Sequence, residues 1–373
     1  MDPHQVFCPN LECPARGQLG EGNVTSHGRK RPRYHCTVCQ TTFSLRRGTP
    51  FYRRRTPEAR ITQVLTLVGY GCPIPAIEAA FGLQGRTVRD WVAAAGQHTQ
   101  ALQAHLVEQP RDLQQVQADE IRVKTQGGIL WLAMAMMVGT RLWLGGTVSR
   151  QRDLALIHRL AQLIWRCAVV APLLLVTDGF ASYPTAFGRV FRMPQRTGQR
   201  GAPRRIPWPA LHVVQVVKAG RGTVGMVSRL VRGRGVLLAA LLRATPGCLV
   251  ANTAYIERLN GTFRARLACL ARRTRGVARQ AQTLEHGMYL VGAIYNFCTF
   301  HRSLTTPARA LRTPAMAAGI TAHRWTVHDL LRYRVPPSRW HPPQGRGRRS
   351  KRLPALIDLG CVMTTVKRTP TSN

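Results

Sequence analysis

The segment between residues 116 and 218 most constrains the fold, because its hydrophobic pattern changes period in a fixed order. Three strand-like runs separated by glycine-containing turns precede an amphipathic helix, a buried strand, a short helix and another strand. We expect strands at 116–124, 129–137, 142–149, 173–177 and 211–218, and helices at 153–167 and 183–187. This order predicts an α/β domain with a mixed five-stranded sheet covered by helices.

Further helices are expected at about 236–243, 253–271 and 283–300. A loop rich in Pro, Arg and Gly is expected at 192–209, followed after the last strand by a basic, Gly-rich, β-like stretch that ends near residue 235. The basic, Gly-rich stretch over 192–235 leaves the course of the last strand open, and it also fits a DNA-contacting insertion.

The charge of the chain indicates a polyanionic partner. The sequence has 54 Lys and Arg residues against 16 Asp and Glu residues, a formal net charge of +38. Such a chain should bind phosphate backbones in a manner that weakens steeply with salt. A ribosome-associated protein and a GC-rich genome are alternatives, but GC bias alone does not remove acidic residues.

The sequence also predicts a soluble, cytoplasmic, nucleoid-associated protein. Its first residues show no basic-then-apolar signal pattern. The longest apolar runs, near 129–138 and 168–176, are about half of the roughly 18 residues that span a bilayer. Ten cysteines in a chain of this length do not form a disulfide scaffold.

Four cysteines near the N-terminus have the spacing of a zinc site. Two pairs lie about two dozen residues apart, and each fits a tight turn: Cys8, Cys13, Cys36 and Cys39. The spacing predicts one structural Zn²⁺ in a zinc ribbon over residues 1–52. Reduced free thiols are the alternative, and His4 and His35 are less favoured substitute ligands.

Residues 53–98 predict a helix-turn-helix domain, with Thr56 capping its first helix. The third helix opens with residues expected to enter a major groove: Arg86, Thr87 and Arg89. Its opposite face carries apolar anchors: Val88, Trp91 and Val92. A plain three-helix bundle has the same pattern, and residues 99–113 are expected to form a linker.

Three acidic residues in this basic chain occur on a strand, at a strand end and on a helix: Asp119, Asp178 and Glu257. Alternation places Gln117, Asp119 and Ile121 on one side of the first strand. Clustered carboxylates repel one another unless cations neutralise them. The pattern predicts two Mg²⁺ or Mn²⁺ ions in a phosphoryl-transfer site.

Each carboxylate also has an alternative reading. Asp178 fits a turn or helix cap, and Glu257 fits an ion pair with Arg258 or Arg264 on a solvated face. Glu120 is an alternative ligand to Asp119.

Several motifs together resemble the DDE transposases of bacterial insertion sequences, of the "IS one" kind, over about residues 5–320. The N-terminal motifs are Arg33-Tyr34-His35-Cys36-Thr37-Val38-Cys39, Thr42-Phe43-Ser44 and Gly48-Thr49-Pro50-Phe51-Tyr52. The catalytic-half motifs are Ala118-Asp119-Glu120, Thr177-Asp178-Gly179 with Tyr183, and Ile256-Glu257-Arg258-Leu259-Asn260 after Asn252-Thr253. The downstream motifs are Tyr295-Asn296-Phe297, His301-Arg302-Ser303-Leu304 and Thr313-Pro314-Ala315.

The resemblance implies an RNase H-like catalytic domain over 114–320 and a basic C-terminal tail over 321–373. It implies that Asp119, Asp178 and Glu257 bind the catalytic metal ions. It implies DNA contacts or support for the glutamate from Arg258, Asn260 and Arg264, with His301 near the active site.

The implied activity is binding of an element's inverted ends, followed by metal-dependent phosphodiester hydrolysis and strand transfer into target DNA. A homodimer or larger homo-oligomer on DNA is expected, because two ends must be cut together. A non-catalytic DNA-binding regulator derived from a transposase and a nuclease on the same fold are the alternatives.

Overall fold

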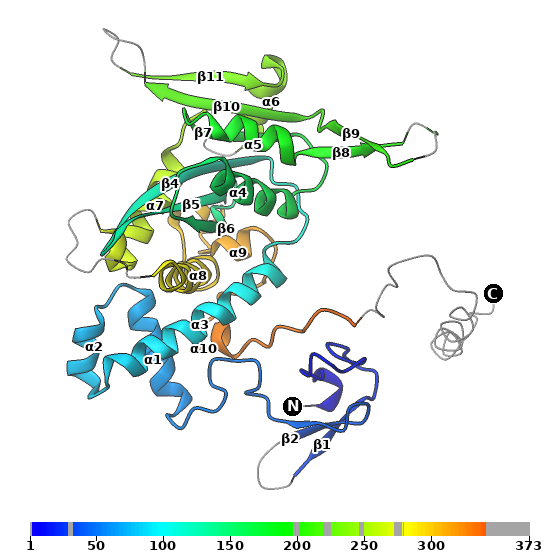
Figure 1. Ribbon diagram of the computed structural model, residues 1–373, viewed down its shortest axis with the longest axis vertical. Helices are drawn as coiled ribbons and strands as arrows, with labels where there is room; N and C mark the ends of the chain where they lie inside the picture. The colour runs from blue at the N-terminus through cyan, green and yellow to red at the C-terminus, as the bar shows by residue number, and fades with distance from the viewer. Residues whose placement is uncertain are drawn as a thin grey trace. The chain divides into compact units, whose positions relative to one another are not determined.

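The structure is a computed structural model that describes residues 2–28, 33–196, 198, 201–218, 225–245, 250–271, 278 and 280–340. It divides into two compact units (Figure 1). Of the described residues, those up to 44 and those over 336–340 belong to one unit, and those over 45–335 belong to the other.

The N-terminal unit is a small antiparallel sheet with a cysteine cluster. A short 3-10 helix, η1 (Pro3–Gln5), precedes three strands that pair in sequence order. These are β1 (Val24–His27), β2 (Arg33–Cys36) and β3 (Thr42–Phe43). Its buried apolar side chains are few, so a metal ion bound by the cysteines would supply much of its stability.

The larger unit is built on a mixed six-stranded sheet with the order β11-β10-β7-β4-β5-β6. The strands are β4 (Gln115–Thr125), β5 (Gly128–Met137), β6 (Leu142–Ser149), β7 (Leu173–Asp178), β10 (Leu211–Lys218) and β11 (Met226–Arg232). β4, β5 and β6 form an antiparallel meander, whereas β7 runs parallel to β4 and β10 runs parallel to β7. The α/β class and five expected strands are confirmed, within one residue at either end.

The expectation of five strands in the sheet is wrong, because β11 adds a sixth. It pairs antiparallel with β10 and comes from the basic, Gly-rich stretch. Six of its seven residues are exposed, so the strand does not require the alternation of apolar and polar residues that reveals a half-buried strand in a sequence. The expected loop at 192–209 likewise contains an exposed hairpin, β8 (Arg192–Gln195) paired with β9 (Arg204–Pro207).

Helices cover both faces of this sheet (Figure 1). Val116 and Ala118 on β4 pack in one core with α4 (Leu154–Cys167) and α5 (Ser182–Val190). Ile121 and Val123, of opposite parity, pack in a second core with α7 (Ala254–Arg266) and part of α8 (Ala281–Cys298). α6 (Gly235–Ala244) packs against β7 and β10, and the 3-10 turn η2 (Ala268–Leu270) follows α7.

The helical segment before the sheet contains α1 (Glu58–Gly69), α2 (Ile74–Phe81) and α3 (Gly85–Leu106). Thr56 does not cap α1, because the helix begins at Glu58 and Pro57 occupies the cap position without a side-chain hydrogen bond. The expected linker at 99–113 is helical as far as Leu106. α3 continues because its buried face extends through Leu102 and packs along α8.

The chain between 321 and 335 is not part of a tail. After η3 (Arg302–Leu304) and α9 (Pro314–Ala317), it forms α10 (Val327–Arg332) within the larger unit. Thr326 caps α10 in a capping box with Asp329, and Leu330 is fully buried. Residues 341–373 of the expected tail lie outside the described residues. Within the described ranges, no helix combines the length and apolar character that crossing a membrane requires.

Candidate functional site

The candidate site lies where β4 and β7 separate. Their parallel pairing runs from Gln115↔Leu174 to Gln117↔Val176 and goes no further. Asp119 and Asp178 each follow two residues after the last pair. The opening between the strands brings together side chains from both faces of the sheet.

Three carboxylates meet at this opening: Asp119, Glu120 and Asp178 lie with one oxygen each within 4.8 Å of the others. Glu120 is buried, with 1% of its side chain exposed, while Asp119 and Asp178 are half-buried. The Oε1 atom of Glu120 has no hydrogen-bond partner among the described residues. An all-oxygen donor set with an unsatisfied buried oxygen fits a hard divalent cation such as Mg²⁺.

Burial and mutual repulsion raise the pKa of two of these carboxyl groups, those of Asp119 and Glu120. Burial, together with the charges of Asp178 and Glu257, raises the pKa of Asp119 to about 6 against the lowering effect of a backbone hydrogen bond. Burial, then the charge of Asp178, raises the pKa of Glu120 to about 7. The cluster therefore favours a bound proton or cation near neutral pH.

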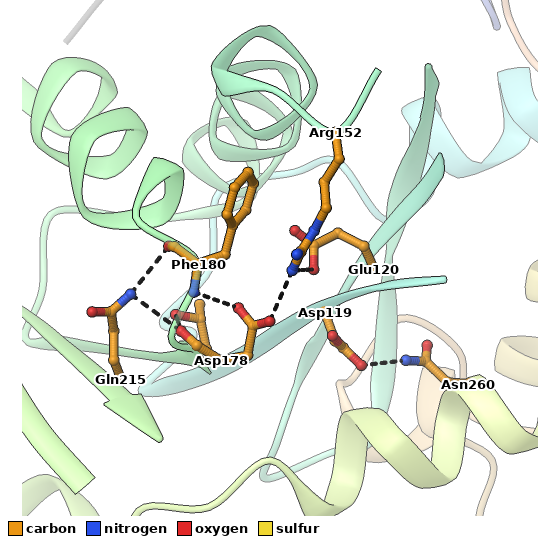
Figure 2. Close-up of polar contacts among 8 residues, drawn as sticks. Asp119, Glu120, Arg152, Asp178, Phe180, Gln215 and Asn260 are labelled. Carbon is orange, nitrogen blue, oxygen red and sulfur yellow. Dashed lines mark hydrogen bonds and ion pairs between the residues drawn. The ribbon is translucent and has the colours of Figure 1, made fainter. Parts of the chain in front are cut away.

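Arg152 supplies a cation from within the chain (Figure 2). One guanidinium nitrogen donates to Asp178 Oδ2 at 2.9 Å and to Glu120 Oε2 at 3.3 Å. The guanidinium also stacks on Phe180, 4.1 Å from the ring centre, and lies 5.3 Å from that of Trp131. Arg152 thus lies between two of the carboxylates and partly balances their charge.

A local hydrogen-bond network fixes the turn that carries Asp178. The Phe180 backbone N–H donates to Asp178 Oδ1 at 3.0 Å. The Gln215 amide donates to the carbonyl oxygens of Asp178 at 3.2 Å and Phe180 at 3.1 Å (Figure 2). Arg229 in turn donates to Gln215 Oε1 at 2.7 Å. Asp178 therefore has both roles, in the turn and in the acidic cluster, because the turn uses only its Oδ1 atom and its Oδ2 atom faces Arg152.

Gln117 attaches helix α7 to the same strand. Its amide donates to the Asn252 carbonyl at 2.6 Å, and its Oε1 accepts from the Ile256 N–H at 2.9 Å. Four residues beyond Ile256 on α7, Asn260 donates to Asp119 Oδ2 at 2.7 Å (Figure 2). Both β4 residues lie on the face predicted by alternation, and they set α7 over the opening.

Glu257 is near the cluster but is not part of it. Its Oε1 accepts a 2.6 Å hydrogen bond from Thr253, and its side chain is exposed at the start of α7. Its charge nevertheless contributes to the raised pKa of Asp119, while that of Arg264 lowers it. The structure thus brings together two of the three predicted carboxylates, Asp119 and Asp178, and the third member of the cluster is Glu120 instead of Glu257.

The other predicted site residues fall into two groups. Arg258 and His301 line a cavity on another side of α7, described further below. Arg86, Thr87 and Arg89 lie in the first turn of α3, where both arginines are exposed and Thr87 is half-buried. The neighbouring Val88 and Trp91 are buried, as the apolar spacing predicts, and Val92 is partly buried.

The four N-terminal cysteines form one group, with sulfur atoms within 4.8 Å of one another. Cys8 and Cys39 are 3.7 Å apart at Sγ, and Cys13 and Cys36 are 3.8 Å apart. Thiolates about 2.3 Å from a central zinc ion, at the corners of a tetrahedron, lie about 3.8 Å apart. The group therefore has the geometry to hold a metal ion of this kind.

Sequence reasoning missed Arg152 and the anchoring role of Gln117, and it gave Glu120 only as an alternative. Arg152 precedes a helix cap in a polar turn, where nothing in the sequence marks it. Glu120 points to the opposite face from Asp119 by strand alternation, so only the separation of the strands reveals their proximity. No protein-family model matches the chain, and no curated protein matches it at a significant level.

Proposed function

We propose that this protein is an insertion-sequence transposase that binds DNA ends and catalyses metal-dependent phosphodiester hydrolysis and strand transfer. The observation that carries the proposal is the meeting of Asp119, Glu120 and Asp178 at the opening between β4 and β7. A chain of net charge +38 is suited to bind a polyanion, and so an acidic cluster retained in it is suited to chemistry on that polyanion.

The order of the strands supports an RNase H-like catalytic domain. An antiparallel meander of three strands is followed by two strands parallel to the first, which is the mixed sheet expected for that fold. One Asp lies on the first of these strands, the next ends the fourth, and Glu257 lies on a helix after the fifth. The sixth strand, β11, is an addition at the edge.

The residues of the chain would divide the work as follows. Asp119, Glu120 and Asp178 would hold divalent ions, and Glu257 would join them by exchanging its hydrogen bond to Thr253. Metal ions held there would activate the attacking oxygen and stabilise the leaving oxygen. Asn260 would orient Asp119, and Arg152 would hold the carboxylates together before an ion binds.

The N-terminal unit and the helices α1–α3 would recognise the DNA. The cysteine group would hold one structural Zn²⁺. Exposed Arg86 and Arg89 at the start of α3, with Thr87, would contact DNA as in a helix-turn-helix. A homodimer or larger assembly on two DNA ends fits this function.

The test is a Mg²⁺- or Mn²⁺-dependent cleavage and strand-joining assay on DNA that carries the element's ends. Asp178→Asn should lower cleavage by at least about 10²-fold, above the roughly 10–100-fold expected for an outer-shell partner. DNA binding should persist, because Asn still accepts from the Phe180 N–H and little bulk changes. Asp112→Asn is the matched control, since exposed Asp112 also accepts from a backbone N–H two residues ahead, at 3.1 Å.

The outcomes separate the candidate functions. Joined products that vanish in Asp178→Asn and persist in Asp112→Asn support the transposase. Cleavage without joining favours a nuclease, and DNA binding without metal-dependent cleavage in the wild type favours a regulator. Equal cleavage by wild type and Asp178→Asn would refute the catalytic role of the cluster.

A further inference from the structure

A cavity lies beside α7, on a different side of the helix from the acidic cluster. Its volume is about 270 Å³, and its walls come from β5, the turn between β5 and β6, α7, α8 and the segment after α8. The lining residues that matter for its chemistry are Arg141, Tyr255, Arg258, Thr262, His301 and Ser303. We call it the Arg141 cavity.

The Arg141 cavity has a positive charge without a counterion. Arg141 is only 9% exposed, and its guanidinium donates to the Val138 carbonyl and lies 3.6 Å above the ring centre of Tyr255. Across the described ranges of the chain, Arg141 forms no ion pair with an acidic side chain. Among the residues with a described position, no Asp or Glu lines the cavity. A buried guanidinium without a carboxylate partner is unfavourable unless an anion reaches it.

His301 reports the same positive environment. Its Nε2 atom is buried and lacks a hydrogen-bond partner in the part of the chain that the structure describes. Burial first, and then the charges of Arg266, Arg141 and Arg258, lower the pKa of His301 to about 4. Three arginine charges thus act on one ring nitrogen, and the hydroxyls of Thr262 and Ser303 lie in the same lining.

Helix α7 connects this cavity to the acidic cluster. Tyr255, Arg258 and Thr262 recur at the spacing of one helix face and line the cavity. Glu257, Asn260 and Arg264, one turn apart on another face, lie toward Asp119. A rigid helix therefore presents a cationic cavity on one side and the candidate catalytic carboxylates on the other.

We propose that the Arg141 cavity binds one phosphate group of a nucleic-acid strand, together with part of the attached nucleoside. Arginine guanidinium groups are the preferred partners of phosphate oxygens, and aromatic rings accept a sugar or base. The volume lies just below the range of about 300–1,000 Å³ typical of small-molecule sites, so it suits a single nucleotide. This assignment rests on the proposed function, because nucleic acid is the phosphate source that the function provides.

The test measures binding of the full-length protein to a labelled oligonucleotide as salt is varied. Replacing one phosphate-contacting arginine should reduce the slope of log affinity against log salt by about one. We expect that reduction for Arg141→Met, which keeps the packed stem, and for Arg258→Gln, which is exposed and safe for folding. Arg243→Gln on α6 is the matched control, since it removes an exposed arginine outside the cavity.

Thermal unfolding is measured with the oligonucleotide, with inorganic phosphate and with a deoxynucleoside monophosphate, at ionic strength matched with chloride. The ligand that raises the unfolding temperature identifies the phosphate source. Protection by the oligonucleotide that is lost in Arg258→Gln supports the nucleic-acid assignment. Protection by the free phosphates alone overturns it, as does an unchanged salt slope in both cavity variants. If the wild type fails to cleave DNA but the salt slope still depends on Arg258, the proposed function fails and the cavity assignment stands.

Discussion

Replacing Glu120 by Gln should stabilise the folded protein at pH 8 when no divalent ion is present. The substitution keeps the size of a side chain that is 1% exposed and removes a charge held between Asp119 and Asp178. The amide oxygen of Gln can still accept from Arg152. The main consequence is therefore electrostatic.

The expected magnitude follows from the pKa of Glu120, about 7 in the folded protein against an ordinary value of 4.5. Below pH 4.5 the carboxyl group is protonated in both states and carries no penalty. As pH rises from 4.5 to 7 the unfolded chain releases this proton first, so the free energy of unfolding falls. At about 1.4 kcal/mol per pH unit the loss is roughly 3 kcal/mol, complete above pH 7, and Glu120→Gln should restore it.

The assay is urea unfolding at pH 5 and pH 8 in the presence of EDTA, followed by tryptophan fluorescence. The wild type should be less stable at pH 8, and Glu120→Gln should lose much of that difference. Adding Mg²⁺ at pH 8 should stabilise the wild type more than Glu120→Gln, because a bound cation favours the ionised cluster. Glu285→Gln, half-buried on α8 and bonded to Gln100, is the control for removing a carboxylate elsewhere.

Two results would refute this reasoning. One is a wild type whose stability does not change between pH 5 and pH 8 in EDTA. The other is Glu120→Gln with the same pH dependence as the wild type, which would locate the titrating group elsewhere.

Three further predictions concern other parts of the molecule. Replacing Cys36 and Cys39 by Ser should reduce bound zinc, measured by atomic absorption, from about one ion per chain to none, and should weaken DNA binding. Asn260→Ala should lower metal-dependent cleavage by roughly 10–100-fold with DNA binding retained, because Asp119 loses its 2.7 Å hydrogen bond. Gly96→Ala should lower thermal stability by about 1–3 kcal/mol, because a Cβ there would lie 2.5 Å from the backbone of α8.

The cysteine and glycine predictions each have a matched control. Cys72→Ser changes a cysteine outside the cluster and should leave zinc content unchanged. Gly127→Ala adds a Cβ with no atom within 4 Å, and should leave stability nearly unchanged. Loss of zinc in Cys72→Ser, or a loss of stability in Gly127→Ala as large as in Gly96→Ala, would contradict the corresponding prediction. An Asn260→Ala variant that cleaves like the wild type would contradict the role of Asn260.

The sequence predicted those parts of the fold in which burial of one or both faces produces a repeating pattern of apolar residues. β4, β5, β6, β7 and β10 were each predicted to within one residue at either end, because one or both faces of each strand are apolar and buried. β8, β9 and β11 pair through the backbone while their side chains stay mostly exposed, so no hydrophobic alternation marks them. The length of α3 also escaped prediction, since its last turns are fixed by packing on α8 and carry many polar residues.

The candidate site was predictable only as far as strand order and strand ends determine it. Asp119 and Asp178 lie near each other because they occupy two adjacent parallel strands, each two residues beyond the last pair of the ladder. Glu120 belongs to the other face by alternation, and its approach to Asp178 depends on how far the strands separate. That separation, and the reach of Arg152 across it, are properties of three-dimensional packing that residue spacing does not encode.

A purely structural role does not account for the acidic cluster. Gln at position 120 would fill the same volume and still bind Arg152 without the roughly 3 kcal/mol penalty of ionisation at pH 8. The repulsion among the three carboxylates is relieved by protons below neutral pH, by Arg152 in part, or by a divalent cation. Arg152 forms ion pairs with Glu120 and Asp178, whereas in the described part of the chain Asp119 forms none and accepts a hydrogen bond from the neutral amide of Asn260. Among the described residues, the chain's own groups therefore leave negative charge uncompensated when the cluster is ionised, and an oxygen-binding metal ion would compensate it at the place where the proposed reaction requires one.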